Sequence, residues 1–219
     1  MSNKLEVTDR FSSEQWEFIA TLDAFGEAIS VDVVSELSPL KPKHLLQVIQ
    51  DGIQLQMIQQ ADPGELCLDP DISAVVRQKV EAINGRDRLN HLLEGLTERN
   101  LKDQVPASAM VCLLTRTGHF SSAAVLERDL ARSALNSRRL LEALPHLGNC
   151  LQLCAQDMES DSSDVIYLEA ALEYSSLAIL LGAEIDQAVF TMETAKNIAK
   201  KSGDRRTLAM LYFIAKHWV

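Results

Sequence analysis

The 219 residues carry a net charge of −10, an acidic balance that repels nucleic-acid phosphates and anionic lipid. Apolar residues make up 47% of the chain, which is enough for a packed core and excludes a disordered protein. Only 5% are aromatic, while leucine and alanine dominate, a composition typical of packed helices rather than of sheets.

The N-terminus, residues 1–15, has no apolar stretch of the kind that a secretory signal contains, and no later run approaches a membrane span. Four cysteines fall in segments that we expect to be structured: Cys67, Cys112, Cys150 and Cys154. The expected setting is therefore a reducing cytoplasm with free thiols and no membrane attachment.

The front of the chain, residues 1–85, predicts three helices, a hairpin and a fourth helix. The expected helices cover residues 14–24, 31–37, 41–54 and 71–83. The third carries an apolar stripe at Leu45, Leu46, Ile49 and Ile53. Between the third and fourth helices, alternating residues flank a Pro63–Gly64 turn and indicate two short antiparallel strands. This order of elements resembles a winged-helix domain.

A winged helix that reads DNA would use residues 41–54 as its recognition helix. Its basic side chains here are Lys41, Lys43 and His44, and these are the candidate DNA-binding residues. However, the helix has no arginine, and the hairpin region carries Asp62, Glu65, Asp69 and Asp71. Residues 1–85 hold 6 Lys+Arg against 14 Asp+Glu, a net charge of −8. The pattern therefore favours a protein-interaction module over a DNA-binding one.

The rear of the chain, residues 86–219, predicts only helices, and Asn84–Gly85 is the expected domain boundary. The expected helices cover residues 86–100, 106–117, 121–135, 137–155, 164–181 and 185–201, with a last helix to the C-terminus. The helix after Gly182 has its stripe at Ile185, Ala188, Val189, Met192, Ala195, Ile198 and Ala199. Polar residues 156–163 indicate a flexible loop.

Two turns in this half resemble the turn between the helices of a tetratricopeptide repeat. That family places glycine, an aromatic residue and alanine at short offsets, and here they are Gly118, Phe120 and Ala123. A second pass begins at Gly182, 64 residues later, close to two repeat lengths of about 34 each. The resemblance predicts an antiparallel helical repeat array that binds a protein or peptide.

Catalytic motifs are absent from the sequence: it has no P-loop, dinucleotide-binding turn, nucleophile elbow or zinc-protease helix. His146, Cys150 and Cys154 share a helix face, but the first and last lie about 12 Å apart along the axis, too far for one zinc ion. Glu169 and Glu173 also share a face, which we interpret as a solvated or ligand-facing surface. We expect no enzyme activity, metal or cofactor.

The last helix has apolar residues on more than one face, so its predecessor cannot cover them all. These residues are Leu208, Leu211, Phe213, Ile214 and Trp218. We expect this end to be covered by a protein partner, by further domains of a longer chain or by a second copy in a homodimer. The candidate partner-binding residues are Glu169, Glu173, Leu211, Phe213 and Trp218.

A winged helix followed by tetratricopeptide-like helices resembles part of the signal-transduction ATPases with numerous domains, which include maltose-regulator-like transcription activators. The resemblance is carried by Phe25–Gly26, residues 41–69, the Gly118 turn and residues 195–206. It implies repeats that sense inducers or partner proteins, but not ATP hydrolysis, because the ATPase is missing. We therefore expect a regulatory protein-interaction module; the alternatives are a DNA-binding regulator and a hydrolase or transferase within the helical half.

Overall fold

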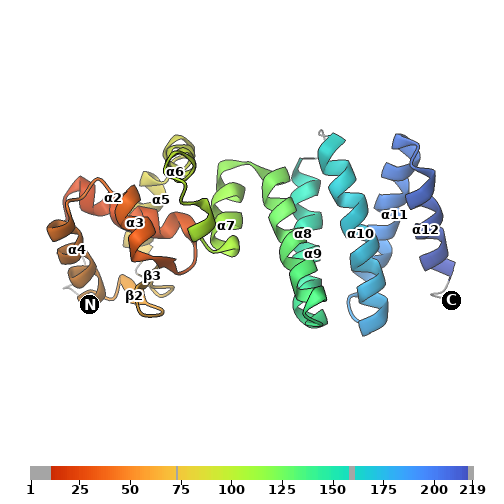
Figure 1. Ribbon diagram of the computed structural model, residues 1–219, viewed down its shortest axis with the longest axis horizontal. Coiled ribbons are helices and arrows are strands. Elements are labelled where there is room, and N and C mark those ends of the chain that lie inside the picture. The colour runs from red at the N-terminus through yellow and green to blue at the C-terminus, as the bar shows by residue number, and fades with distance from the viewer. Residues whose placement is uncertain (1–10, 73, 158–160, 217–219) are drawn as a thin grey trace. The chain divides into compact units, whose positions relative to one another are not determined.

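The computed structural model describes residues 11–72, 74–157 and 161–216. The described part is mainly α-helical, with eleven α-helices, one short 3-10 helix and one three-stranded antiparallel sheet near the N-terminus (Figure 1). This confirms the predicted mainly helical class. The chain divides into two compact units, Met1–Gly118 and His119–Val219, which are described in turn.

The first unit contains six of the α-helices and all three strands. In chain order its elements are α2 (Ser13–Phe25), β1 (Ile29–Ser30), α3 (Val31–Leu37), α4 (Pro42–Gln54), β2 (Ile58–Gln60), β3 (Glu65–Leu68), α5 (Ala74–Ile83), α6 (Arg86–Glu98), the 3-10 helix η1 (Lys102–Gln104) and α7 (Ala107–Thr117).

Helix α2 is the centre of this unit. A capping box starts it, because the Ser12 hydroxyl accepts from the Gln15 amide and the Gln15 side chain accepts from the Ser12 amide. Gly26, in the left-handed conformation with φ 68°, ends it. Between these ends α2 contacts α3, α5, α7 and β3, which is why Trp16, Phe18 and other large side chains on several of its sides are buried.

The sheet has the order β1–β3–β2. Strands β2 and β3 pair with Ile58 opposite Leu68 and Gln60 opposite Leu66, which confirms the predicted hairpin. Strand β1 is the third strand and pairs with β3, with Ile29 opposite Leu66. Strand β1 was not predicted, because a strand of two residues is too short to show an alternating pattern.

The expected boundary at residues 85–86 lies inside the first unit, which extends to Gly118. The reason is packing: α6 contacts α3, and α7 contacts α2. Polar contacts reinforce this, since Arg116 of α7 forms an ion pair of 2.9 Å with Asp23 of α2. The break in the apolar pattern at Asn84–Gly85 is therefore only the end of one helix and the start of the next.

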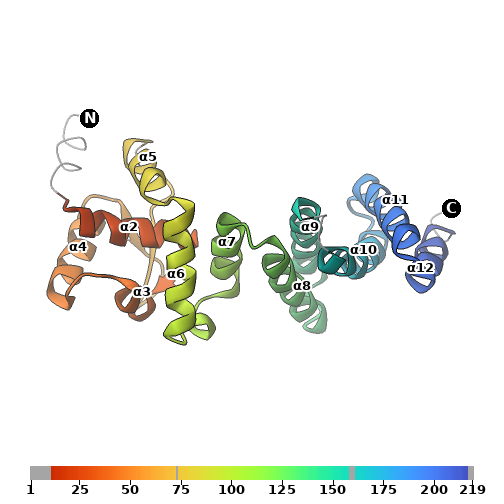
Figure 2. The same ribbon diagram turned by 90° about the horizontal axis from the view of Figure 1, so that it is seen from above.

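The second unit is a row of five helices: α8 (Phe120–Asn136), α9 (Leu140–Gln156), α10 (Asp161–Leu181), α11 (Ile185–Ser202) and α12 (Arg205–Lys216). Each helix packs antiparallel against the next, and α10 also contacts α8 and α12 (Figures 1 and 2). Small residues on the buried side of α8, including Ala123, Ala124 and Ala131, allow the close approach of α9. No helix among the described residues is both long and apolar enough to span a membrane.

Two details of this unit differ from what the sequence predicts. Helix α10 begins at Asp161, so Asp161–Ser163 are helical rather than loop, while residues 158–160 of the expected loop lie outside the described residues. Three helices, α8 to α10, lie between Gly118 and Gly182, so these glycines are not equivalent positions of a two-helix repeat. Both have positive φ after a helix, a role that glycine takes at any helix end.

Candidate partner-binding surface

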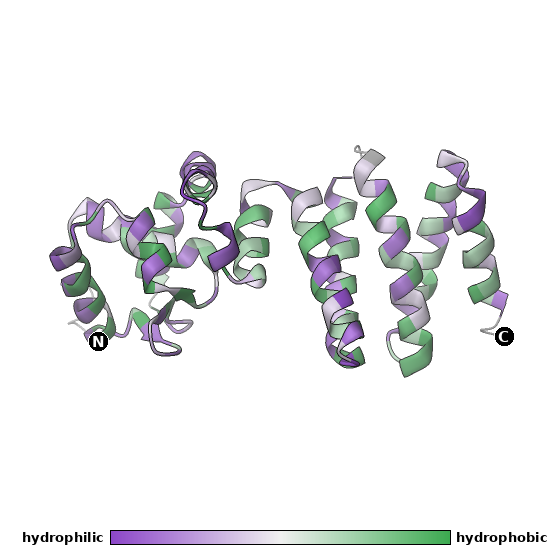
Figure 3. Cartoon of the chain, viewed as in Figure 1, coloured by the Kyte–Doolittle hydropathy of each residue, from purple (hydrophilic) through white to green (hydrophobic). Residues whose placement is uncertain are grey.

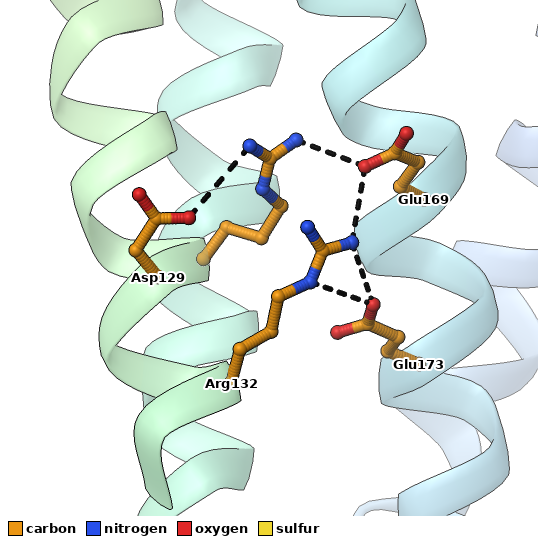
Figure 4. Close-up of polar contacts among 5 residues, drawn as sticks. Asp129, Arg132, Glu169 and Glu173 are labelled. Atoms are coloured by element: carbon orange, nitrogen blue, oxygen red, sulfur yellow. Dashed lines mark hydrogen bonds and ion pairs between the residues drawn. The ribbon is translucent and has the colours of Figure 1, made fainter. Parts of the chain in front are cut away.

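Two predicted glutamates lie in a charged network between α8 and α10 (Figure 4). Glu169 Oε2 is 2.9 Å from Arg128 Nη1 and 3.1 Å from Arg132 Nη2. Glu173 Oε1 accepts hydrogen bonds from Arg132 Nη2 at 2.8 Å and from Arg132 Nε at 3.1 Å. Both pairs are spaced four residues apart, so each presents its charges on one side of its helix.

The network passes from the interior of the helix row to solvent. The Arg128 side chain is 17% exposed and also lies 3.7 Å from Asp129, whereas Glu169 is 46% exposed. The hydrogen bond to Glu173 raises the pKa of Arg132, which therefore stays charged. At the buried side, Arg128 Nε and Glu173 Oε2 have no hydrogen-bond partner among the described residues. The outer edge of the network is accessible to a partner.

Glu169 and Glu173 are therefore not free carboxylates, because they join α8 to α10. Sequence reasoning missed Arg128 and Arg132, although their spacing matches that of the glutamates. The available signal was an arginine pair and a glutamate pair with the same four-residue spacing. Arg132 and Glu173 are 41 positions apart, however, and nothing in the sequence indicated that the two pairs meet.

The helix face of α9 that carries His146, Cys150 and Cys154 packs inside the second unit. His146 Nδ1 lies 2.6 Å from Oε2 of the buried Glu127 on α8, and Asn149 donates to Glu127 Oε1 at 3.1 Å. Cys150 and Cys154 are buried, and their mutual hydrogen bond, together with burial, raises the pKa of the Cys150 thiol. Within the described ranges, no group of three or more His, Cys, Asp or Glu residues is arranged to hold a metal ion.

Exposed apolar side chains are concentrated on the last three helices. Of the twelve large apolar side chains that are exposed among the described residues, nine lie on α10, α11 and α12. They are Val165, Ile179, Leu180, Ile185, Val189, Phe190, Met210, Tyr212 and Phe213. Figure 3 colours the helices by hydropathy and shows the apolar C-terminal end of α10. Sequence periodicity missed the exposure of Ile185 and Val189, because it placed both in the buried stripe of α11.

The predicted partner-binding residues of the last helix do not share one exposed face. Phe213 is exposed, as expected of a partner-binding residue, and Trp218 lies outside the described residues. Leu211 is 0% exposed, so its assignment to an open face is corrected: α12 turns it into the core of the second unit. A residue two positions from Phe213 lies on another side of an α-helix, where it can pack inward.

The candidate DNA-binding residues lie at the start of α4. Lys41 is its N-cap, Lys43 and His44 are in its first turn, and all three are exposed. They belong to the first unit and are not part of the α8–α10 network. The predicted apolar stripe of this helix is also divided: Leu45 is buried with Val48, whereas Leu46 is 61% and Ile53 42% exposed.

No family model, no curated protein and no solved structure matches this chain.

Proposed function

We propose that this chain is a non-catalytic protein-interaction module with a regulatory role, in which the second unit binds a protein or peptide partner. The concentration of exposed apolar side chains on α10, α11 and α12 carries this proposal. Phe190, for example, is 65% exposed although the helices beside it form a core. Contiguous exposed apolar patches mark interfaces in soluble proteins, and aromatic residues dominate the energy of such interfaces.

The charged network gives this surface selectivity between partners. Its exposed edge combines cations of α8 with carboxylates of α10, so it would favour a partner with the complementary order of charges. Exposed ion pairs contribute little to folding stability, typically below about 1 kcal/mol. The exposed edge of the network therefore adds little to stability, and we assign it a role in recognition.

The architecture of both units is compatible with this role. We assign the second unit to the tetratricopeptide-like class, supported by consecutive antiparallel helices with α10 contacting α8 and α12. We assign the first unit to the winged-helix class, supported by the order helix, strand, helix, helix, hairpin and by the sheet order β1–β3–β2. In such proteins the helical array is the part that binds partners.

The alternative function is that of a DNA-binding regulator. It rests on Lys41, Lys43 and His44, which are exposed at the start of α4 and whose side chains make no hydrogen bond or ion pair among the described residues. An electrophoretic mobility shift at low salt tests it, using the full chain and its Lys41→Ala/Lys43→Ala/His44→Ala variant. Binding that the triple variant loses, with a steep dependence on salt, would favour the alternative.

The test of the proposed function is capture of partners from an extract of the source cells, followed by covalent cross-linking and identification. The immobilised full chain is compared with Leu180→Ser/Phe190→Ser, which removes two exposed apolar side chains from α10 and α11. We expect at least one protein to be cross-linked to the second unit of the wild type and reduced about tenfold with the variant.

Leu141→Ser is the matched control, because Leu141 is an exposed leucine on α9, outside the three helices in question. It should retain the captured protein. If every captured protein binds the wild type, the double variant and the control equally, the exposed side chains of α10 and α11 do not form a binding surface. Circular dichroism of each variant establishes that its helices are intact.

A further inference from the structure

Helix α4 of the first unit has two apolar faces, and only one of them is used by the fold. Leu45, Val48 and Gly52 form the buried face. Leu46 and Ile53, seven residues apart, are exposed on another side, with the half-buried Ile49 between them. Positions i, i+3 and i+7 follow one line along an α-helix, so these three residues form a continuous stripe.

The stripe has the dimensions of a helix-binding surface. Leu46 and Ile53 are separated by about 10 Å along the helix axis, or two turns. A second helix that lies across α4 would present its own apolar residues over the same length. Glutamines at positions 47, 50 and 54 are exposed, and they can remain hydrated beside the contact.

The charges around the stripe indicate which partner fits. The side chains of Lys41, Lys43 and His44 are exposed at one end of α4, and none of these side chains makes a hydrogen bond or ion pair within the described part of the chain. The sole acid of α4, Asp51, is about 140° around the helix from Leu46 and therefore faces away from the stripe. Cations at the N-terminal end of a helix are disfavoured by the helix dipole, and α4 nevertheless has them.

We propose that the stripe of α4 is a docking surface for an acidic amphipathic helix of a partner protein. The apolar side of that helix packs on Leu46, Ile49 and Ile53, and its carboxylates lie near Lys43, which is about 60° around α4 from Leu46. This surface belongs to the first unit and is additional to the proposed surface on α10–α12. It fits a helix better than duplex DNA, because leucine and isoleucine side chains offer no donors to phosphates.

The test uses the full 15N-labelled chain and a synthetic 15-residue helix-forming peptide. The peptide has leucines at positions 4, 8 and 11 and glutamates flanking them at both ends; its twin has lysines in place of the glutamates. We expect chemical-shift changes concentrated on α4 with the acidic peptide, and binding of the lysine twin weaker by about tenfold or more. The difference in affinity between the two peptides should shrink in 1 M salt, because the screening length there is only about 3 Å.

Two variants assign the contact. Leu46→Ser/Ile53→Ser should weaken binding of the acidic peptide by about tenfold or more, and Lys43→Glu should weaken it while improving the lysine twin. Leu141→Ser, an equally apolar and exposed site on α9, should change neither. These side chains are exposed, so the variants are expected to fold, which the dispersion of the amide spectrum verifies.

Equal affinity for both peptides, or shifts that lie on other helices, would overturn the proposal. A short duplex DNA that shifts α4 while the acidic peptide does not would overturn it in favour of the DNA-binding alternative. Failure here leaves the capture experiment on α10 and α11 unaffected, because the two tests use different surfaces and different variants.

Discussion

The two units differ in where their aromatic residues lie. In the first unit Trp16, Phe18 and Phe25 all lie on α2 and are buried. The second unit buries Tyr167 and Tyr174 on α10, but it also has Phe190 and Tyr212 exposed on α11 and α12. Burying an aromatic side chain is among the largest single contributions to a core, whereas an exposed one contributes to stability only weakly. The buried aromatic residues of both units serve folding, and the exposed ones of the second unit are available for contacts.

Charged groups show the same contrast. In the first unit Asp23 is a part-buried link, because its carboxylate accepts from both Arg116 and Asn84 at 2.9 Å. In the second unit Glu169 joins two arginines but is nearly half exposed. The Asp23 link therefore ties helices together internally, whereas the Glu169 network joins helices at an accessible surface. The following variants test this comparison.

The largest effect is expected from matched phenylalanine truncations. Phe25→Ala removes a fully buried ring from α2 and should lower the free energy of unfolding of the first unit by about 3–5 kcal/mol. Phe190→Ala removes an exposed ring and should change stability by less than about 0.5 kcal/mol. Urea unfolding followed by circular dichroism measures both, and comparable losses would contradict the contrast between the units.

The second prediction sharpens the contrast within one helix. Leu211→Ala should destabilise the second unit by about 2–5 kcal/mol, because Leu211 is fully buried where α12 packs on α11. Met210→Ala, one residue earlier and exposed, is the control and should be nearly neutral. Thermal unfolding compares them. If Leu211→Ala changed only self-association and left unfolding unaltered, α12 would bury a different face.

The sequence predicted most helices well, because their apolar residues recur over long segments. In α11, Ala188, Met192 and Ala195 were expected in the core and are buried there. Periodicity was less informative for α4, where two adjacent apolar faces exist and only tertiary contacts decide which is covered. Leu45 and Leu46 were assigned to one stripe, yet the fold buries the first and exposes the second.

The charged surface was harder to predict than the helices. Glu169 and Glu173 were selected from their spacing alone, which is a local property. Their contacts with Arg128 and Arg132 depend on how α8 lies beside α10, and a single sequence does not reveal the register of helices so far apart. The same limit placed the unit boundary at residues 85–86, since the packing of α6 and α7 on α2 and α3 is also non-local.

The third prediction compares the two carboxylates. Asp23→Ala should destabilise the first unit by about 1.5–3 kcal/mol, because it leaves part-buried donors of Arg116 and Asn84 without their acceptor. Glu169→Ala should cost less than about 1 kcal/mol, because its ion pairs are exposed to solvent. Only the second effect should diminish in 1 M salt. Chemical unfolding at low and high salt distinguishes these outcomes from a uniform loss.

The smallest expected effect concerns Asp204 at the start of α12. Its Oδ1 accepts from the Thr207 amide at 3.0 Å, and hydrogen bonding to Thr207 holds the pKa of this carboxyl below its usual range. A depressed pKa means that the charged form favours the folded helix. The stabilisation is therefore present above the pKa of the unfolded carboxyl, about 3.9, and is lost as pH falls through the lower, folded value.

Three proteins compared by 13Cα shifts of residues 205–208 measure this cap: the wild type, Asp204→Asn and Asp204→Ala. At pH 6.5 the wild type and Asp204→Asn should be similarly helical, because both side chains accept from the amide, while Asp204→Ala frays. As pH falls below about 4, only the wild type should move toward the alanine variant. The shift should be small, because the carboxyl is fully exposed, and a pH-independent wild type would show that its charge does not stabilise α12.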